Sequence, residues 1–188
     1  MLILTDCDGV LLNWEYAFDV WMERKGYQKI EMYNLEYNIG KRYGISYDHY
    51  KRLIADFNES AMIGFLPPLR DAIEYVQKLH REHGCVFHVI SSLSLDPAAC
   101  QLRTQNLHKI FGETVFEGFT YLDTGADKDD ALAKYKDKEL YWIEDKIENA
   151  ELGKRLGLNS ILMEHGHNMN HKGIPLVKNW KELYAMIT

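Results

Sequence analysis

The chain has 188 residues, of which 46% are hydrophobic, and a formal net charge of −6 at pH 7. This length and composition suit one core domain with a small appendage. The negative charge argues against a partner such as duplex DNA or RNA, because a nucleic-acid surface needs a basic face.

The three cysteines, Cys7, Cys85 and Cys100, are odd in number and follow no metal-binding pattern. Cys7 and Cys85 lie in strand-like apolar runs, so we expect buried thiols rather than disulfides or metal ligands. The sequence begins directly with a strand-like run, without a signal-peptide pattern, and no apolar run approaches membrane-spanning length. We therefore expect a soluble, cytoplasmic protein with no membrane partner.

Leu2 to Thr5 form a short apolar run that predicts a buried strand, and Asp6 and Asp8 follow it directly. Open α/β sheets bind ligands at the carboxyl ends of their strands. Side chains two positions apart in an extended chain point the same way, so these carboxylates would need a cation or a shared proton. Gly9 allows a sharp turn, but Asp and Gly are also common in ordinary turns, and the fragment alone leaves both interpretations open.

The segment after the first strand changes to helical spacing. Apolar residues recur at three- and four-residue intervals from Trp14 onward, and Gly26 can end this helix. Ser46 is a typical residue to precede a second helix, and a Pro-Pro pair at 67–68 interrupts the chain. The irregular stretch between the two helices contains Tyr27, Tyr33, Tyr37 and Tyr43.

We therefore interpret residues 13–66 as a helical insert, and residues 1–12 and 67–188 as an α/β core. Aromatic residues at helical spacing usually pack in a core, which is what we expect of the helical Trp and Phe residues. The tyrosines of the irregular stretch suit a lid over a ligand, because their rings are amphipathic.

Helical and strand-like segments alternate through the rest of the chain, which is typical of a parallel sheet with helices on its faces. Predicted helices cover 69–83, 97–112, 127–135, 149–156 and 180–187. Predicted strands cover 85–90, 115–122, 140–143 and 159–163. Gly118 weakens the strand over 115–122, so we expect that strand at an edge of the sheet.

Polar side chains follow two of these strands. Ser91 and Ser92 come directly after one strand, and Glu144 and Asp145 directly after another. Lys128 lies at the start of a helical stretch between them. Because the carboxyl ends of parallel strands share one edge, these side chains and the two N-terminal carboxylates should lie together. Such a set of groups suits Mg²⁺ and a phosphoryl group.

The four motifs together resemble the haloacid dehalogenase (HAD) superfamily. The family pattern is D-x-D-G-[V/T], a strand ending in Ser or Thr, a Lys, and a strand ending in paired acids. In this chain the motifs read Asp6-Cys-Asp-Gly-Val10, Val-Ile-Ser91-Ser, Asp-Lys128-Asp-Asp and Trp-Ile-Glu144-Asp145. Each is weak alone, but all four occur in order over essentially the whole chain. The resemblance implies a Rossmann-like parallel sheet of order 5-4-1-2-3, flanked by helices, with a C1-type helical cap at 13–66.

The resemblance also implies roles for the two N-terminal carboxylates. Asp6 resembles the nucleophile that attacks phosphorus and forms an aspartyl-phosphate. Asp8 would be the general acid for the leaving alkoxide and later the base for water, and its backbone carbonyl would join the metal shell. An acid at this position points to release of an alcohol from a phosphomonoester.

The other motif residues take their expected roles from the same resemblance. Asp145 would bind Mg²⁺, with Glu144 either on the metal or holding a metal-bound water. Ser91 would donate to a phosphoryl oxygen, and Ser92 could add a second donor to the substrate. Lys128 would neutralise the transferring phosphoryl charge.

Three other lysines compete with Lys128 for that role, because the spacing to the acid pair varies in the family. They are Lys134, Lys136 and Lys138. We favour Lys128, which begins its helix where the edge of the sheet should lie, and interpret the other three as a solvated face.

His165, His167 and His171 have the spacing H-x-H-x-x-x-H, which raises the possibility of a zinc site. The segment lacks cysteines and contains a glycine, so we expect a solvated loop near the edge of the site instead.

The resulting hypothesis is a Mg²⁺-dependent phosphomonoesterase acting on a small phosphorylated metabolite. Two consecutive serines and a cap with Tyr33, Tyr37 and Tyr43, which could stack on a base, favour a nucleotide, as in 5′(3′)-deoxyribonucleotidase-like relatives. The alternative is a sugar-phosphate phosphatase or phosphomutase, which shares every catalytic residue. A non-catalytic binding protein of the same fold is disfavoured, because every motif position is filled. Fold and motifs fix neither the leaving group nor the oligomeric state.

Overall fold

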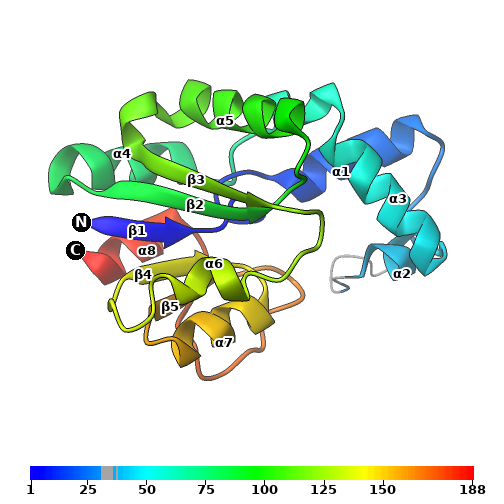
Figure 1. Ribbon diagram of the computed structural model, residues 1–188. Helices are drawn as coiled ribbons and strands as arrows, with labels where there is room; N and C mark the ends of the chain where they lie inside the picture. The colour runs from blue at the N-terminus through cyan, green and yellow to red at the C-terminus, as the bar shows by residue number, and fades with distance from the viewer. Residues whose placement is uncertain (31–35, 37) are drawn as a thin grey trace.

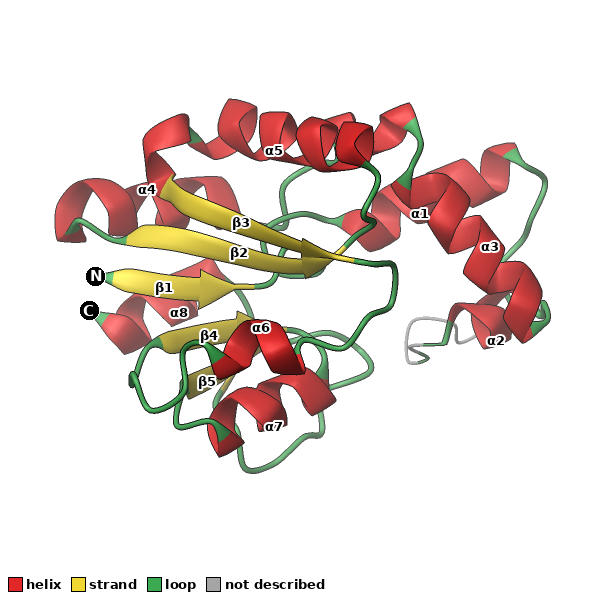
Figure 2. Cartoon of the chain, viewed as in Figure 1, coloured by secondary structure: helices red, strands yellow, loops and turns green. Residues whose placement is uncertain are grey.

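The computed structural model describes residues 1–30, 36 and 38–188. Its described residues form one parallel sheet of six strands in the order β3-β2-β1-β4-β5-β6 (Figures 1 and 2). The strands are β1 (Leu2–Thr5), β2 (Val86–Ser92), β3 (Phe116–Leu122), β4 (Tyr141–Glu144), β5 (Asn159–Met163) and β6 (Leu176–Val177).

The predicted order 5-4-1-2-3 is confirmed for the first five strands. The weak strand, now β3, lies at one edge as expected, and it pairs only with β2. The difference is β6, which adds two residues beside β5 at the other edge. A strand this short carries no alternation or apolar run that sequence patterning could detect.

Alternation of side chains along the strands divides the core into two layers. In β1, Ile3 joins a cluster that includes residues of helices α4 (Ala72–His83), α5 (Pro97–Phe111) and α8 (Trp180–Ile187). Leu4 points to the opposite face and joins a cluster with residues of α6 (Asp129–Ala133) and α7 (Ile147–Arg155). Both faces of the sheet are therefore covered, as the continuous apolar runs of the strands require.

Several helix boundaries differ from those predicted. The helix expected over 69–83 begins at Ala72, because Arg70 has a φ of +44°, which no α-helix accommodates. The helix expected over 127–135 is shorter and runs from Asp129 to Ala133. The cysteines are free thiols, and Cys7 and Cys85 are buried as predicted.

The described part of residues 13–66 contains helices, as expected. It contains α1 (Trp14–Arg24), α2 (Ile39–Tyr43), α3 (Tyr47–Asn58) and the 3-10 helix η2 (Ala61–Phe65). Figure 1 shows α1 and α3 beyond the carboxyl ends of the strands. The helical aromatics form a packing core: Trp14 stacks on Phe18 with ring centroids 4.7 Å apart, and Phe57 meets Phe18 edge to face at 5.3 Å.

Asn58 is buried and links α1 and α3 to the loop after β2. Its Oδ1 accepts a hydrogen bond from Trp14 Nε1 at 2.9 Å, and its Nδ2 donates to the carbonyl of Leu93, just after β2, at 2.8 Å. A second link joins Ser94 Oγ to Glu59 Oε1 at 2.8 Å. The end of α3 is therefore fixed to the loop that follows β2.

Within the described residues, no helix combines the length and the apolar character that a membrane span requires.

Candidate functional site

The candidate site lies where β1, β2 and β4 end. Thr5 of β1 pairs with Val89 of β2 on one side and with Ile143 of β4 on the other. Asp6, one residue further on, continues this pairing, since its backbone N–H donates to the carbonyl of Ile143 at 2.8 Å. This register places Asp6 between the serine motif and the acid pair, as the sequence predicts.

Lys128 is buried at the centre of the site. Its Nζ lies 2.8 Å from Asp6 Oδ2 and 2.9 Å from Glu144 Oε2. The backbone of Lys128 caps α6, so its position is fixed by the start of that helix. Of the four candidate lysines, Lys128 is the one that the structure brings to the acids, whereas Lys134, Lys136 and Lys138 are exposed.

Glu144 is fully buried, and both of its carboxylate oxygens are engaged. Oε1 accepts from the backbone N–H groups of Asp145 and Lys146, at 3.0 and 3.1 Å. Oε2 accepts from Lys128 Nζ and, at 3.1 Å, from Asn149 Nδ2. Glu144 thus orients Lys128 and the start of the loop that carries Asp145.

The site holds three carboxyl groups, Asp6, Glu144 and Asp145, beside one buried ammonium group, that of Lys128. Burial, followed by the nearby Glu144 carboxylate, raises the pKa of Asp6 well above its usual range, although Lys128 acts in the opposite direction. Burial and the same carboxylate also raise the pKa of Asp145. The pKa of Glu144 is lowered, because Lys128 and the hydrogen bonds to the carboxylate outweigh its burial. One lysine therefore stabilises Glu144 as an anion but cannot do so for all three acids.

The unbalanced acids form an oxygen-ligand cluster. One carboxylate oxygen from each of Asp6, Glu144 and Asp145 lies within 4.8 Å of the others. Oxygen donors at this spacing suit a hard divalent cation such as Mg²⁺, and the added positive charge would relieve the repulsion that raises the two pKa values. Glu144 fits direct coordination less well than Asp6 and Asp145, because four donors already occupy its oxygens.

Gly9 permits the close approach of the two acidic loops. It has a φ of +75°, and a Cβ atom at this position would lie 2.5 Å from Asp145 Oδ2. Any other residue would therefore be strained and would push against a carboxylate of the cluster.

Asp8 is not one of the three acids of this cluster, and it pairs with an arginine that we did not predict. Arg103 Nη1 donates to Asp8 Oδ1 at 2.7 Å. Burial raises the pKa of Asp8, and Arg103 opposes that rise. The sequence does contain a signal for Arg103, because it lies four residues from both Ala99 and Leu107 and so belongs to the buried stripe of α5.

The serines differ in their surroundings. Ser91 Oγ is buried and has no hydrogen-bond partner among the described residues, which leaves its proton available to a bound anion. Ser92 Oγ donates to the backbone carbonyl of Ala126 at 2.8 Å, so its proton is already engaged.

Of the three tyrosines expected to contact substrate, Tyr33 and Tyr37 lie outside the described residues. Tyr43 is buried, its ring packs on Phe18, and its hydroxyl donates to Asp19 Oδ1 at 2.5 Å. We expected Tyr43 to contact substrate through an accessible ring. Because the ring is buried, it packs against the protein instead. We therefore leave Tyr43 out of the proposed substrate contacts.

The histidine loop is not the solvated segment that we expected. His165 Nε2 donates to the carbonyl of Gly9 at 2.7 Å, because a carbonyl can only accept. Asn168 Nδ2 donates to the carbonyl of Asp145 at 2.7 Å, and His167 Nε2 lies 3.1 Å from the same oxygen. In the part of the chain that the structure describes, these histidines are not part of a metal-ligand cluster. Their loop instead joins the loop after β1 to the loop after β4.

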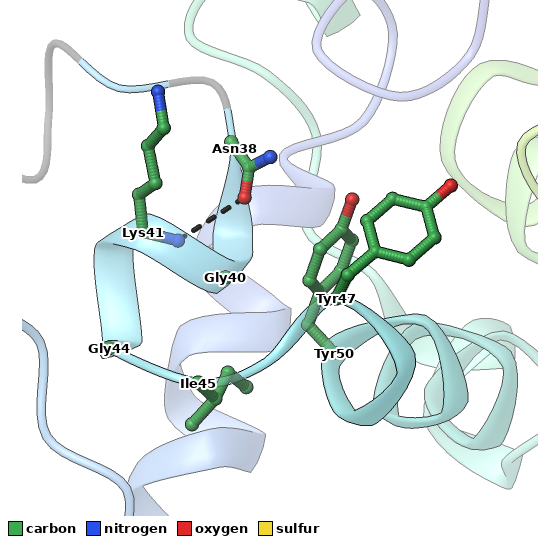
Figure 3. A pocket seen from close by; sticks show the side chains of 7 residues that line it. All are labelled: Asn38, Gly40, Lys41, Gly44, Ile45, Tyr47 and Tyr50. Atoms are coloured by element: carbon green, nitrogen blue, oxygen red, sulfur yellow. Dashed lines mark hydrogen bonds between the residues drawn. The ribbon is translucent and has the colours of Figure 1, made fainter.

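A separate hollow of about 290 Å³ lies between α2 and α3. Figure 3 shows Tyr47 and Tyr50 on one side of it and Lys41 on the other. Gly40 allows the two helices to meet there, since a Cβ at this position would lie 2.7 Å from Tyr50 Cδ1. The hollow contains none of the residues of the candidate site.

Comparison with known proteins identifies the fold. No protein-family model matches the chain, and no curated protein matches it. Among solved structures, a haloacid dehalogenase-like family hydrolase from Streptococcus pneumoniae is similar over 100% of this chain and 98% of its own, with a TM-score of 0.67 and 13% identity.

Two further solved structures are similar in fold to this chain. A HAD family hydrolase from Deinococcus radiodurans, with bound phosphate and sodium, covers 99% of this chain and 94% of its own at 18% identity, with a TM-score of 0.61. A putative β-phosphoglucomutase from Thermotoga maritima covers 99% and 97% at 14% identity, with a TM-score of 0.60. The chain therefore has the fold of the HAD hydrolases.

The buried hydrogen bond of His165 predicts a pH-dependent loss of stability. Burial lowers the pKa of His165 to about 4. The pKa of an unfolded histidine is about 6.5. Between about pH 6.5 and pH 4, His165 therefore binds a proton in the unfolded chain but not in the folded chain. The free energy of unfolding falls as the pH falls through this range. His165→Gln keeps a donor for Gly9 but cannot titrate. Between pH 7 and 4.5, we expect its unfolding free energy to fall by about 1–2 kcal/mol less than that of the wild type.

The measurement is urea unfolding of both proteins in EDTA across this pH range. Parallel pH profiles for the two proteins would contradict the assignment of His165 as a neutral donor.

Proposed function

We propose that the protein is a divalent-cation-dependent phosphomonoester hydrolase that acts through an aspartyl-phosphate on Asp6. The observation that carries the proposal is the contact of Lys128 Nζ with Asp6 Oδ2 at 2.8 Å, beside Asp145 and the unpartnered hydroxyl of Ser91. A nucleophile, a fixed cation, a metal-ligand set and a hydroxyl donor at one edge of the sheet are the groups that phosphoryl transfer uses.

The nucleophile is held in position before substrate binds. Asp6 Oδ1 accepts from the backbone N–H of Cys7 at 2.7 Å, while Oδ2 faces Lys128. In the first step an Asp6 oxygen forms a bond to phosphorus as the bond from phosphorus to the leaving oxygen breaks. Lys128 and Ser91 stabilise the phosphoryl oxygens during this transfer.

Asp8 acts as the proton donor in the first half-reaction and as the proton acceptor in the second. It gives a proton to the leaving oxygen in the first step and takes one from water in the second. In that second step the water oxygen bonds to phosphorus as the bond from phosphorus to Asp6 breaks, which releases inorganic phosphate and restores Asp6. Asp6 and Asp145 would hold Mg²⁺, which, when bound, supplies further positive charge to the phosphoryl group.

For the substrate we propose a small phosphorylated metabolite, with a nucleotide as the first candidate. The consecutive serines and the motif sequence support the nucleotide, whereas the burial of Tyr43 and the engaged hydroxyl of Ser92 remove two of its expected contacts. A sugar phosphate is the second candidate, and the likeness to a putative β-phosphoglucomutase favours it. We retain the helical segment 13–66 as the proposed cap over the leaving group.

Asp6→Asn should abolish turnover. The variant keeps the acceptor for Cys7 but removes the nucleophile, so we expect kcat/KM to fall by about 10³-fold or more. The measurement is phosphate release from a panel of nucleoside monophosphates and sugar phosphates. Asp123→Asn is the matched control, because Asp123 is exposed in a loop outside the site. Turnover by Asp6→Asn close to that of Asp123→Asn would contradict a covalent route through Asp6.

Removal of divalent cations should also stop the reaction, because Lys128 alone does not balance the buried acids. We expect phosphate release to vanish in EDTA and to return with excess Mg²⁺. Ca²⁺ should restore less activity, because it takes more ligands at longer distances. An enzyme that keeps its full rate in EDTA would contradict the metal assignment of Asp6 and Asp145.

A further inference from the structure

Arg103 is a fully buried arginine that points from α5 to the loop after β1. Its Nη1 donates to Asp8 Oδ1 at 2.7 Å and to Cys7 Sγ at 3.0 Å. The side chain of Arg103 is 0% exposed, whereas that of Asp8 is 25% exposed. One end of this ion pair is therefore buried in the core, and the other reaches the surface of the site.

Stability alone is a weak reason to keep an arginine at this position. Neither Nε nor Nη2 of Arg103 has a hydrogen-bond partner within the described ranges. Burying a guanidinium with unpaired donors is costly, and an apolar side chain of similar volume often replaces a buried ion pair without loss of stability. An effect of the arginine on Asp8, its charged partner, accounts for this residue better than stability does.

The contact fixes one half of the Asp8 carboxylate. Among the described residues, the hydrogen bond from Arg103 is made to Oδ1, and no hydrogen bond is made to Oδ2. Since Arg103 extends from the middle of α5, a helix of 15 residues, its guanidinium is held by a rigid element. Asp8 is thus held through Oδ1, while Oδ2 stays available to a bound molecule.

We propose that Arg103 is a positioning residue that holds Asp8 Oδ2 for proton transfer to the leaving group. This inference rests on the proposed phosphomonoesterase function. As Asp6 bonds to phosphorus, the electron pair of the breaking bond stays on the leaving oxygen, which takes the proton from Asp8 Oδ2. The products are the free alcohol, the aspartyl-phosphate and an Asp8 carboxylate paired with Arg103.

A positioning role makes the effect of Arg103 depend on the leaving group. An alkyl phosphate releases a strongly basic alkoxide and needs the proton in the transition state. A dinitrophenyl phosphate releases a stable phenolate and needs it little. The quantity to compare is kcat/KM, since it reports on the steps up to departure of the leaving group and not on hydrolysis of the aspartyl-phosphate.

The experiment measures kcat/KM of the wild type, Arg103→Met and Arg103→Lys with glycerol 3-phosphate and with 2,4-dinitrophenyl phosphate. General acid catalysis contributes about 10²- to 10⁴-fold, so Arg103→Met should lose about 10²-fold or more with the alkyl ester and only a few-fold with the aryl ester. Arg103→Lys keeps the charge without the planar guanidinium, so we expect a smaller loss with the same selectivity. Asp8→Asn sets the upper limit of the effect.

Asn106→Leu is the matched control for packing. Asn106 is also buried on α5, where its Nδ2 donates to the carbonyl of Leu66 at 3.0 Å, and the structure records no contact of its side chain with Asp8. Any effect of this change should be the same for the two esters.

Equal losses with both esters in Arg103→Met would show a structural role and would overturn the inference. If that variant fails to fold, the ratio of the two losses in Arg103→Lys decides in the same way. A wild type that releases phosphate from neither ester nor any member of the metabolite panel would overturn the proposed function, and this inference with it. An active wild type with unselective Arg103 variants would overturn the inference alone.

Discussion

The site depends on the contact of one buried ammonium group with two carboxylates on neighbouring strands. Lys128 joins Asp6, which follows the central strand β1, to Glu144 at the end of β4. Removing one partner of a buried pair typically costs about 3–5 kcal/mol, because the remaining charge loses its compensation. The ends of β1 and β4 and the start of α6 are therefore held in a common position by this cluster.

The same cluster explains why the site should bind a cation and an anion together. Lys128 stabilises Glu144 as an anion, but burial and mutual repulsion still raise the pKa values of Asp6 and Asp145. A divalent cation would complete the charge balance, and the combined positive charge would then favour a phosphoryl group beside Ser91. Gly9 is required because the backbone at this position passes close to the Asp145 carboxylate, where no side chain would fit.

The sequence predicted the fold well where the signal is local. The buried parallel strands are continuous apolar runs, and the polar residues that follow them mark the edge where the site lies. Contacts between distant segments left no such mark. Arg103 and Asp8 are 95 positions apart, and His165 and Gly9 are 156 apart, so only the assembled sheet brings each pair together. A helical wheel places Arg103 on the buried face of α5, but it does not identify the partner that makes burial tolerable.

Tyr43 shows a limit of a different kind. Its neighbours in the sequence suggested an irregular, accessible stretch, but the residue ends the short helix α2 and its ring packs against α1. Packing against a distant element determined its exposure, and composition alone could not predict this.

The proposed reaction depends most directly on a covalent bond between Asp6 and phosphorus. Acid quenching of the wild type during turnover, followed by borohydride reduction, converts an acyl phosphate of aspartate to homoserine, which peptide mass spectrometry can locate. We expect homoserine at position 6 when substrate and Mg²⁺ are both present, and none when substrate is omitted. Phosphate release under the same conditions without any modification at position 6 would contradict the proposed reaction.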